Sequence, residues 1–387
     1  MTLTEKDNQY VANTYKRFPV EIVSGKGSLV YDSRGRRYID LGTGIAVNTF
    51  GVADEAWQQA VIRQAGMVQH MSNLYYTEPC AELARMLCER TGMKKVFFGN
   101  SGAEANECAI KVARKYAAEH LGPAYSTIVT LRNSFHGRTL TTLAATGQDH
   151  FHELFQPLTP GFVHVSAGDA EELRAVFARE KVAGVLIECV QGEGGVIPLD
   201  PAYAKAVEEI AHENGALLMV DEVQTGNGRT GSLYAYMQYG LSPDVVTTAK
   251  GLAGGLPLGA ALMSEKVQHV LGYGDHGSTF GGNPVSCAAA VSVLSRIDEA
   301  VLAGVRERSA FIRERLTGAP GIRSVTGLGL MLGIETEKPA GEVVAACMEK
   351  GVLCLTAKTK VRLLPALNIP QDLLAEAMGV LREACAG

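Results

Sequence analysis

The chain lacks the features that mark several large classes of protein. It has no apolar stretch near the roughly 20 residues that a membrane-spanning helix needs, and residues 1–7 hold no apolar segment of the kind found in signal peptides. Its basic residues form no stripe or tail, and the net charge is −5. These absences argue against membrane and nucleic-acid partners. We therefore expect a cytoplasmic protein that acts on small molecules.

Motifs for metals and nucleoside triphosphates are missing too. The chain has no CxxC pair, no Cys/His cluster at metal-ligand spacing and no GxxxxGK[ST] sequence. Its eight cysteines are scattered, at positions 80, 88, 108, 189, 287, 347, 354 and 385. We expect these thiols to be reduced and mostly buried, and we predict no metal site.

The chain does have ample apolar residues, at 47%, and many glycines, at 43. Between about residues 95 and 265, strand-like apolar runs alternate with loops and helical segments. The expected strands cover residues 94–98, 126–131, 182–188, 216–221 and 243–249. This alternation predicts an α/β fold with a mostly parallel central sheet flanked by helices.

The two ends of the chain predict a smaller α+β domain. Residues 20–42 resemble a β-hairpin around the turn at 32–35. Beyond 285 we expect helices at 285–297, 300–316 and 371–385, and short strands at 330–334 and 360–364. The predicted division is an N-terminal segment of 1–45 that joins the small domain, a large domain of 46–285, and a C-terminal small domain of 286–387.

Lys250 is the most informative residue. It follows the apolar run 243–249 and precedes the glycine-rich stretch 251–255, so it belongs to the carboxyl edge of a buried strand, where α/β sheets bind ligands. Burial there would lower its pKa and supply an uncharged amine able to attack a carbonyl. A surface lysine is the ordinary alternative, favoured about ten to one for a lysine considered alone.

Two other strand ends strengthen the case for a ligand. Asp221 ends an apolar run, so its carboxylate needs a cationic partner such as a protonated ring nitrogen, unless it only caps a loop. Ser101 and Gly102 precede a predicted helix, whose N-terminus would favour a phosphate. A plain N-cap explains the same two residues.

Two loops complete the pattern. Phe135 and Arg138 could stack on a flat ring and bind a carboxylate, although packing and solvation are the common roles of such residues. Ser278 and Thr279 offer hydroxyl groups among glycines, as a tight turn also would. Together these segments require a ligand with a phosphate, a flat ring, a ring nitrogen and a carbonyl. Pyridoxal phosphate has all four.

These residues give the chain a family resemblance. It resembles the class III (fold type I) pyridoxal-phosphate aminotransferases, and among them it is most similar to the acetylornithine aminotransferases. The similar segments, in order, are residues 100–106 (NSGAEAN), 134–139 (SFHGRT), 188–195 (ECVQGEGG), 221–226 (DEVQTG), 249–251 (AKG), 277–284 (GSTFGGNP) and 362–365 (RLLP). The resemblance implies a homodimer with sites at its interface.

The resemblance also implies roles at the cofactor. Lys250 would hold it covalently and move a proton, while Asp221 would pair with the ring nitrogen. Phe135 and Val223 would pack on the two ring faces, with Gln224 near the ring hydroxyl. The remaining cofactor-binding residues would be Ser101, Gly102 and Ala103 at the phosphate, Glu222 beside Asp221, and Thr279 at the phosphate of the neighbouring subunit.

Four residues would serve the substrates. Arg362 would bind the α-carboxylate of glutamate or 2-oxoglutarate, and Glu193 would pair with Arg362 while the ω-amino donor is bound. Arg138 and Ser278 match positions that contact acetylornithine, and Arg138 would also bind the distal carboxylate of 2-oxoglutarate.

The sequence departs from the family pattern in two places. Ala103 stands where relatives often have threonine, which removes one hydroxyl from the expected phosphate site. Residues 51–55 (GVADE) stand where many relatives have Gly-His-x-His-Pro. The second departure affects only the expected N-terminal contacts with the substrate pocket.

The resemblance implies transfer of the δ-amino group of N2-acetylornithine to 2-oxoglutarate, a step of arginine biosynthesis. Ornithine, succinylornithine and 4-aminobutyrate aminotransferases share these motifs and remain alternatives. From other classes, an aminomutase or a decarboxylase of the same fold would need no added 2-oxo acid. A non-catalytic amino-acid-binding protein is a further alternative, disfavoured because Lys250 and Asp221 are both present.

Overall fold

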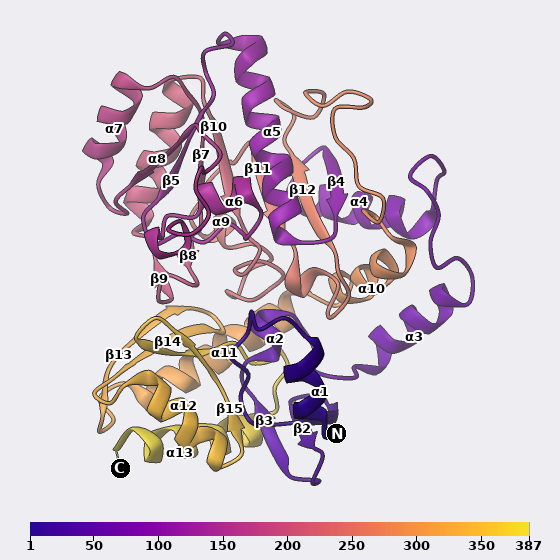
Figure 1. Ribbon diagram of the computed structural model, residues 1–387, viewed down its shortest axis with the longest axis vertical. Coiled ribbons are helices and arrows are strands. Elements are labelled where there is room, and N and C mark those ends of the chain that lie inside the picture. Colours follow the sequence, from indigo (N-terminus) through magenta and orange to yellow (C-terminus); the bar gives the residue numbers. More distant parts are fainter. Residues whose placement is uncertain (387) are drawn as a thin grey trace.

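A seven-stranded sheet forms the centre of the upper body in Figure 1, in a computed structural model that describes residues 1–386. Its strand order is β4-β12-β11-β10-β7-β5-β6. The strands are β4 (Lys95–Gly99), β5 (Thr127–Leu131), β6 (Phe162–Val165), β7 (Val182–Ile187), β10 (Leu217–Asp221), β11 (Val245–Thr248) and β12 (Gly259–Met263). Only β12 runs antiparallel to its neighbours. The predicted α/β fold with a mostly parallel sheet is confirmed, although β6 and β12 were not predicted.

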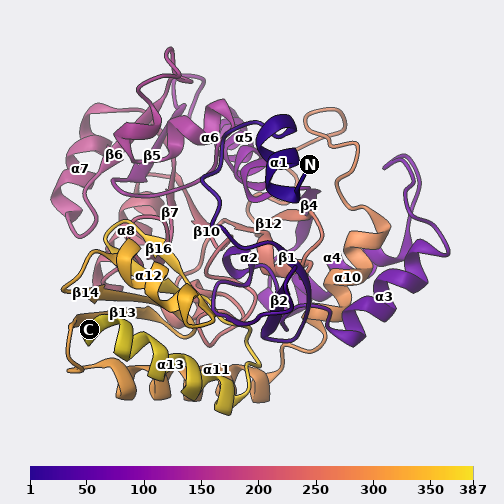
Figure 2. The same ribbon diagram turned by 60° about the horizontal axis from the view of Figure 1, so that its bottom comes forward.

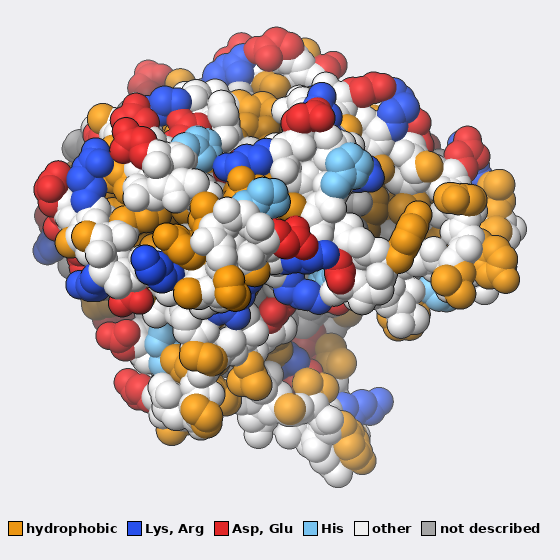
Figure 3. All heavy atoms as spheres, turned by 90° about the horizontal axis from the view of Figure 1, so that it is seen from above, with side chains coloured by type: hydrophobic (Ala, Val, Ile, Leu, Met, Phe, Trp, Pro, Cys, Tyr) orange, Lys and Arg blue, Asp and Glu red, His pale blue; other side chains and the backbone are white. Residues whose placement is uncertain are grey.

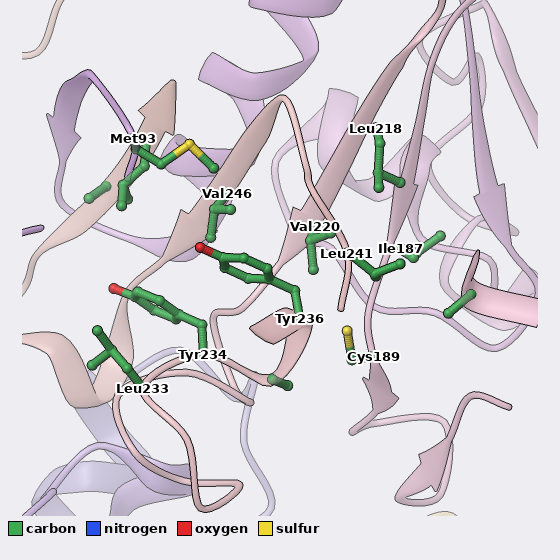
Figure 4. Close-up of a cluster of buried hydrophobic side chains, with 14 of the residues drawn as sticks. Met93, Ile187, Cys189, Leu218, Val220, Leu233, Tyr234, Tyr236, Leu241 and Val246 are labelled. Carbon is green, nitrogen blue, oxygen red and sulfur yellow. The ribbon is translucent and has the colours of Figure 1, made fainter. Parts of the chain in front are cut away.

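Side chains of the central strands alternate between two cores. Leu217 and Met219 of β10 pack with helix α5 (Gly102–His120), whereas Leu218 and Val220 pack on the opposite face with α7 (Ala170–Arg179) and α8 (Pro201–Glu213). Figure 4 shows part of the second core, where Val220 and Val246 lie near Tyr236. Because both faces are covered, β5, β7, β10 and β11 are buried along their whole length.

Helices α3 (Glu55–Ala65), α4 (Glu78–Thr91) and α10 (Pro284–Leu294) extend this body to the right in Figure 1. Buried residues of α10 share the core of the large sheet, and that core continues through Ile297 to Leu302 at the start of the next helix. The domain limits predicted at 45/46 and 285/286 stay a prediction. The packing of α10 favours a large-domain limit near Ile297, which we propose.

The lower body has two four-stranded sheets, ordered β1-β2-β3-β15 and β13-β14-β17-β16. Their strands are β1 (Ile22–Lys26), β2 (Leu29–Asp32), β3 (Arg37–Asp40), β13 (Ile322–Leu328), β14 (Met331–Thr336), β15 (Val352–Leu353), β16 (Leu355–Ala357) and β17 (Lys360–Leu363). The predicted hairpin is the antiparallel β2–β3 pair, and β3 pairs in turn with β15. The N-terminal hairpin therefore completes a sheet with the C-terminal part of the chain.

Three helices cover these sheets: α11 (Glu299–Leu316), α12 (Ala340–Glu349) and α13 (Gln371–Ala386). In Figure 2, α11 and α13 lie side by side along the lower edge. The shorter elements are α1 (Leu3–Tyr10), α2 (Thr43–Ala46), α6 (Leu140–Ala145), α9 (Ala235–Gln238), the 3-10 turns η1 (Asp149–Phe151) and η2 (Lys250–Leu252), and strands β8 (Val190–Gln191) and β9 (Ile197–Pro198).

Two further observations bear on the predictions made from composition. All eight cysteines are free, and six of them are buried. Within residues 1–386, none of the helices combines the length and apolar character that a bilayer crossing requires.

Candidate active site

A cavity of about 570 Å³ opens at the carboxyl ends of the central strands. Its wall is formed by the loops that follow β4, β5, β7, β10 and β11, together with Tyr15 and Val47 from the N-terminal segment. This is the edge at which open α/β sheets bind ligands. Nine of the predicted site residues line the cavity: Ser101, Gly102, Ala103, Phe135, Arg138, Asp221, Val223, Gln224 and Lys250. Glu193 lies beside it and accepts a hydrogen bond from Gln224.

Lys250 begins the turn η2 directly after β11 and lines the cavity. Its backbone is left-handed, with φ of 46°, a strained conformation for a residue with a side chain, of the kind that concentrates at functional sites. Burial lowers the pKa of the Lys250 amine, while the carboxylates of Glu193 and Asp221 act in the opposite direction. The predicted direction of this pKa shift is confirmed.

Asp221 is buried at the end of β10 and accepts three hydrogen bonds. Asn106 Nδ2 donates to Oδ2 over 2.7 Å, the backbone N–H of Val223 donates to Oδ1 over 2.9 Å, and His136 Nδ1 lies 2.9 Å from Oδ2. In turn, the Thr247 hydroxyl donates to Asn106 over 2.7 Å. These partners fix the carboxylate at the cavity wall.

His136 and Asn106 are site residues that sequence reasoning missed. Both line the cavity and are nearly inaccessible to solvent. The Nε2 atom of His136 is buried without a hydrogen-bond partner among residues 1–386, which is uncommon in a folded protein. Both stand inside segments already noted for their family resemblance, and a polar residue on the apolar face of α5 was a signal that could have identified Asn106.

The start of α5 can accept a phosphate. Ser101 caps the helix by accepting the N–H of Glu104 over 3.2 Å, which leaves the N–H groups of Gly102 and Ala103 without partners inside the helix. A Cβ atom on Gly102 would come within 2.7 Å of Val223 Cγ1. Glycine therefore allows the start of α5 to pack closely against Val223.

Glu188 is a second buried carboxyl that sequence reasoning did not assign. It lines the cavity and accepts the backbone N–H groups of Phe135, over 3.0 Å, and Gly192, over 3.2 Å. Burial, together with the nearby Asp221 carboxylate, raises the pKa of Glu188 to about 7, although His136 and the two backbone N–H groups act in the opposite direction. Through Phe135, this carboxyl holds the aromatic loop against the cavity.

Arg362 and Glu193 form an ion pair beside the cavity. Arg362 is buried on β17 of the lower body, and its Nη1 lies 2.5 Å from Glu193 Oε1. Gln224 contacts both partners, accepting from Arg362 over 3.2 Å and donating to Glu193 over 3.3 Å. Burial would raise the pKa of Glu193, but Arg362 overrides this effect and the pKa is lowered. The structure brings these two predicted residues together.

Besides Arg362 and Glu193, which lie beside the cavity, three predicted residues do not line the cavity of this chain. The Glu222 carboxylate accepts the Thr225 hydroxyl, over 2.5 Å, and the Tyr236 N–H, over 2.7 Å, away from the cavity wall. Successive residues of a strand end point in opposite directions, so Glu222 cannot share the site of Asp221. Ser278 accepts from Asn100 and Gly281, and Thr279 is exposed.

Residues 51–55, which depart from the family pattern, have a structural role together with the adjoining Trp57. Asp54 caps α3 by accepting the N–H of Trp57 over 2.9 Å, and it pairs with Arg296 at 2.7 Å. The Trp57 indole donates to the carbonyl of Ala253 over 2.8 Å, in the loop after Lys250. This segment therefore braces the lysine loop from outside instead of lining the cavity.

Comparison with known proteins identifies the family. The model for class III aminotransferases matches residues 10–385. The chain belongs to the class III aminotransferases. This aminotransferase is 49% identical over 383 residues to the acetylornithine aminotransferase of Haemophilus ducreyi, covering 98% of each chain. It is 44% identical to the acetylornithine aminotransferase of Caldanaerobacter subterraneus, covering 97% of each.

Solved structures agree on the fold. The ornithine aminotransferase of Toxoplasma gondii superposes with a TM-score of 0.94 at 32% identity, covering 98% of this aminotransferase and 93% of that chain. The N-acetylornithine aminotransferase of Stenotrophomonas maltophilia superposes with a TM-score of 0.86 at 35% identity, covering 99% and 98%.

The aminotransferase is a pyridoxal-phosphate enzyme, and its cavity fits that cofactor. The free N–H groups at the start of α5 suit a phosphate, and the buried Asp221 carboxylate suits a cationic ring nitrogen. The amine of Lys250, with its lowered pKa, suits an aldehyde. Residues 1–386 contain no group of three or more His, Cys, Asp or Glu side chains placed to hold a metal ion.

Proposed function

We propose that this transaminase moves the δ-amino group of N2-acetylornithine to 2-oxoglutarate, giving N-acetylglutamate 5-semialdehyde and glutamate in arginine biosynthesis. The names of its relatives, at 42–49% identity over nearly the whole chain, support this donor. The observation that carries the proposal is the ion pair between the buried Arg362 and the half-buried Glu193, next to Lys250. One cavity must accept an ω-amine and an α-amino acid in turn, and a carboxylate that can leave Arg362 makes both possible.

We assign the cofactor contacts as follows. Pyridoxal phosphate, when bound, supplies a ring that withdraws electrons from the carbon bearing the amino group. Asp221, held by Asn106 and His136, would keep an anion at the ring nitrogen. Gly102 and Ala103 would donate N–H groups to the phosphate, and Phe135 and Val223 would pack on the ring faces. Lys250 would hold the cofactor and then carry a proton as a free amine.

The substrate contacts follow from the two arginines. With Glu193 in place, the charge of Arg362 is neutralised. The reacting end of an ω-amino donor, which carries an amine and no carboxylate, could then lie beside Arg362. With Glu193 displaced, the Arg362 guanidinium would bind the α-carboxylate of glutamate or 2-oxoglutarate in bidentate fashion. Arg138 would bind the carboxylate at the far end of either substrate.

Replacing Glu193 with glutamine tests this switch. Glutamine retains the size of the side chain and its contact with Gln224 but cannot neutralise Arg362. We expect the half-reaction with acetylornithine to slow roughly 10- to 100-fold, as for the loss of one buried charge partner, and the half-reaction with glutamate to change less than about 3-fold. Single-turnover absorbance of the cofactor measures each half separately, and equal losses in both would rule out the switch.

The donor is tested by a side-by-side assay. Acetylornithine, ornithine, succinylornithine and 4-aminobutyrate are each supplied with 2-oxoglutarate, and the highest kcat/KM is expected for acetylornithine. A preference for another donor would reassign the substrate within the family. Activity without any 2-oxo acid would instead indicate an aminomutase or a decarboxylase, and absence of a bound-cofactor absorbance band would indicate a non-catalytic binding protein.

We further propose that the enzyme is a homodimer with sites at its interface. Apolar side chains gather at the right-hand edge of Figure 3, the side on which Figure 1 shows α3. Exposed large apolar residues in and after α3 are Ile62, Met67, Val68, Met71, Leu74, Tyr75 and Tyr76, and Phe280 is exposed as well. An apolar surface of this extent favours a protein interface. Asn73 joins this segment to the Ser278–Gly281 loop through two hydrogen bonds of 2.9 Å.

This arrangement would explain the exposed Thr279, because a partner subunit would place its own cavity against that loop. Sedimentation equilibrium at micromolar concentration should give twice the mass of the 41.2 kDa chain. An active monomer would contradict the proposal. We also propose a cytoplasmic location, which cell fractionation would test.

A further inference from the structure

The two arginines of the site have different partners. Arg362 is paired with the carboxylate of Glu193. Arg138 lines the cavity, and no carboxylate of residues 1–386 lies within 4.0 Å of its guanidinium nitrogens. Its guanidinium carbon instead lies 4.2 Å from the ring centroid of Phe151 and 5.6 Å from that of Phe135. Arg138 is thus held by aromatic rings.

Hydrogen bonds hold the turn η1 that carries Phe151. The backbone N–H of Phe151 donates to the carbonyl of Gln148 over 3.0 Å, and the buried Gln148 side chain donates to the carbonyl of Ser134 over 2.9 Å. The Ser134 hydroxyl accepts the N–H of Gly147 over 3.0 Å. These bonds connect η1 to the residue before Phe135, so that the Phe135 and Phe151 rings meet edge to face at 5.9 Å.

An aromatic partner has a chemical consequence that an acidic partner lacks. A cation–π contact uses the face of the guanidinium and attracts it without occupying its N–H donors. Those donors remain able to grip a carboxylate in bidentate fashion. Where Arg362 must release Glu193 before it binds a carboxylate, Arg138 needs no such release.

We propose that Phe151 is a positioning residue that fixes the Arg138 guanidinium at the cavity wall as a permanently open site for the distal carboxylate of the substrate. This inference rests on the proposed function, because it takes Arg138 as the residue that binds that carboxylate. Phe151 does not itself line the cavity. It acts through Arg138.

The test measures binding without turnover in the holoenzyme. Glutarate has the length of 2-oxoglutarate but no keto group, and pentanoate replaces one of its carboxylates with a methyl group. Calorimetric titration of both compounds gives their dissociation constants, and the ratio of these constants gives the contribution of the second carboxylate to binding. We expect Phe151→Leu to weaken glutarate binding between about 3- and 30-fold, the range of a cation–π contact, and to leave pentanoate binding within about 2-fold.

Three comparison variants sharpen the result. Phe155→Leu is the matched control, because Phe155 lies in the same loop, is exposed and has no contact with the Arg138 guanidinium. Phe151→Tyr retains the ring face and should bind glutarate within about 2-fold of the unmodified enzyme. Phe151→Met provides a second ringless variant if the leucine variant folds poorly. In turnover, KM for 2-oxoglutarate should rise in the ringless variants while kcat stays within about 2-fold.

Glutarate binding that is unchanged in both ringless variants would overturn the proposal, as would equal weakening of glutarate and pentanoate. Arg138→Gln separates this outcome from failure of the proposed function. If that variant still prefers glutarate to pentanoate, Arg138 is not the carboxylate site and the inference falls with it. If Arg138→Gln loses the preference and Phe151→Leu retains it, only the role of Phe151 is wrong.

Discussion

Replacing Lys250 with alanine is expected to reduce turnover by at least about four orders of magnitude. The variant loses both the amine that bonds to the cofactor and the base that carries the proton, and among residues 1–386 no other lysine lines the cavity. The loop should survive the change, because the Thr49 hydroxyl still donates to the Gly251 carbonyl over 2.7 Å. Steady-state assays give the rate, and the absorbance of the bound cofactor should shift to that of the free aldehyde.

Lys250→Arg and Lys350→Ala complete this experiment. Arginine retains the positive charge but is no nucleophile at neutral pH, so the loss of turnover in Lys250→Arg should approach that in Lys250→Ala. Lys350 is exposed and pairs with Glu383 far from the cavity, so its removal should leave the rate unchanged. A Lys250→Ala variant with more than about one hundredth of the normal rate would contradict the assignment.

Replacing Asp221 with asparagine should reduce kcat about 100- to 1,000-fold, a loss typical of removing one preorganised electrostatic contact. Asparagine is nearly the same size and can still accept the Val223 N–H, but it provides no negative charge for a ring nitrogen. His136 would lose its anionic partner as well. Cofactor affinity, measured by dialysis and absorbance, should fall together with kcat.

Asp244 offers a matched control for this variant. It is also buried, and its Oδ2 lies 3.0 Å from His212 Nε2, but it is remote from the cavity. Asp244→Asn should lower the unfolding temperature and leave kcat of the folded enzyme within about 3-fold. If both variants lost activity equally, Asp221 would be a structural residue and not a cofactor contact.

The sequence predicted those parts of the site that a single strand end determines. Lys250 and Asp221 each follow a buried apolar run, so their place at the carboxyl edge could be foreseen. His136 and Asn106 could not, because their contacts with Asp221 span 85 and 115 residues and depend on how α5 packs. The pairing of Arg362 with Glu193 spans 169 residues and two bodies, and only the family resemblance predicted it.

The strands of the fold also could be predicted from the sequence only in part. Strands rich in β-branched residues, such as β11, were recognised, whereas β12 (GAALM) has no such residue. Strand β6 (FVHV) lies at the edge of the sheet, is mostly half-buried, and has its apolar run interrupted by His164. Glu222 shows that a family resemblance alone does not establish that a residue contacts the cofactor. It adjoins Asp221 in the same motif, yet it packs under the loop, where burial raises its pKa to about 7.

The central claim is that this cavity holds pyridoxal phosphate through Lys250. Borohydride reduction of the purified holoenzyme, followed by proteolysis and mass spectrometry, locates the cofactor on the chain. We expect one reduced cofactor per chain, on the peptide that contains Lys250, and none in Lys250→Ala. A cofactor attached to any other lysine, or no attachment in an active enzyme, would contradict it.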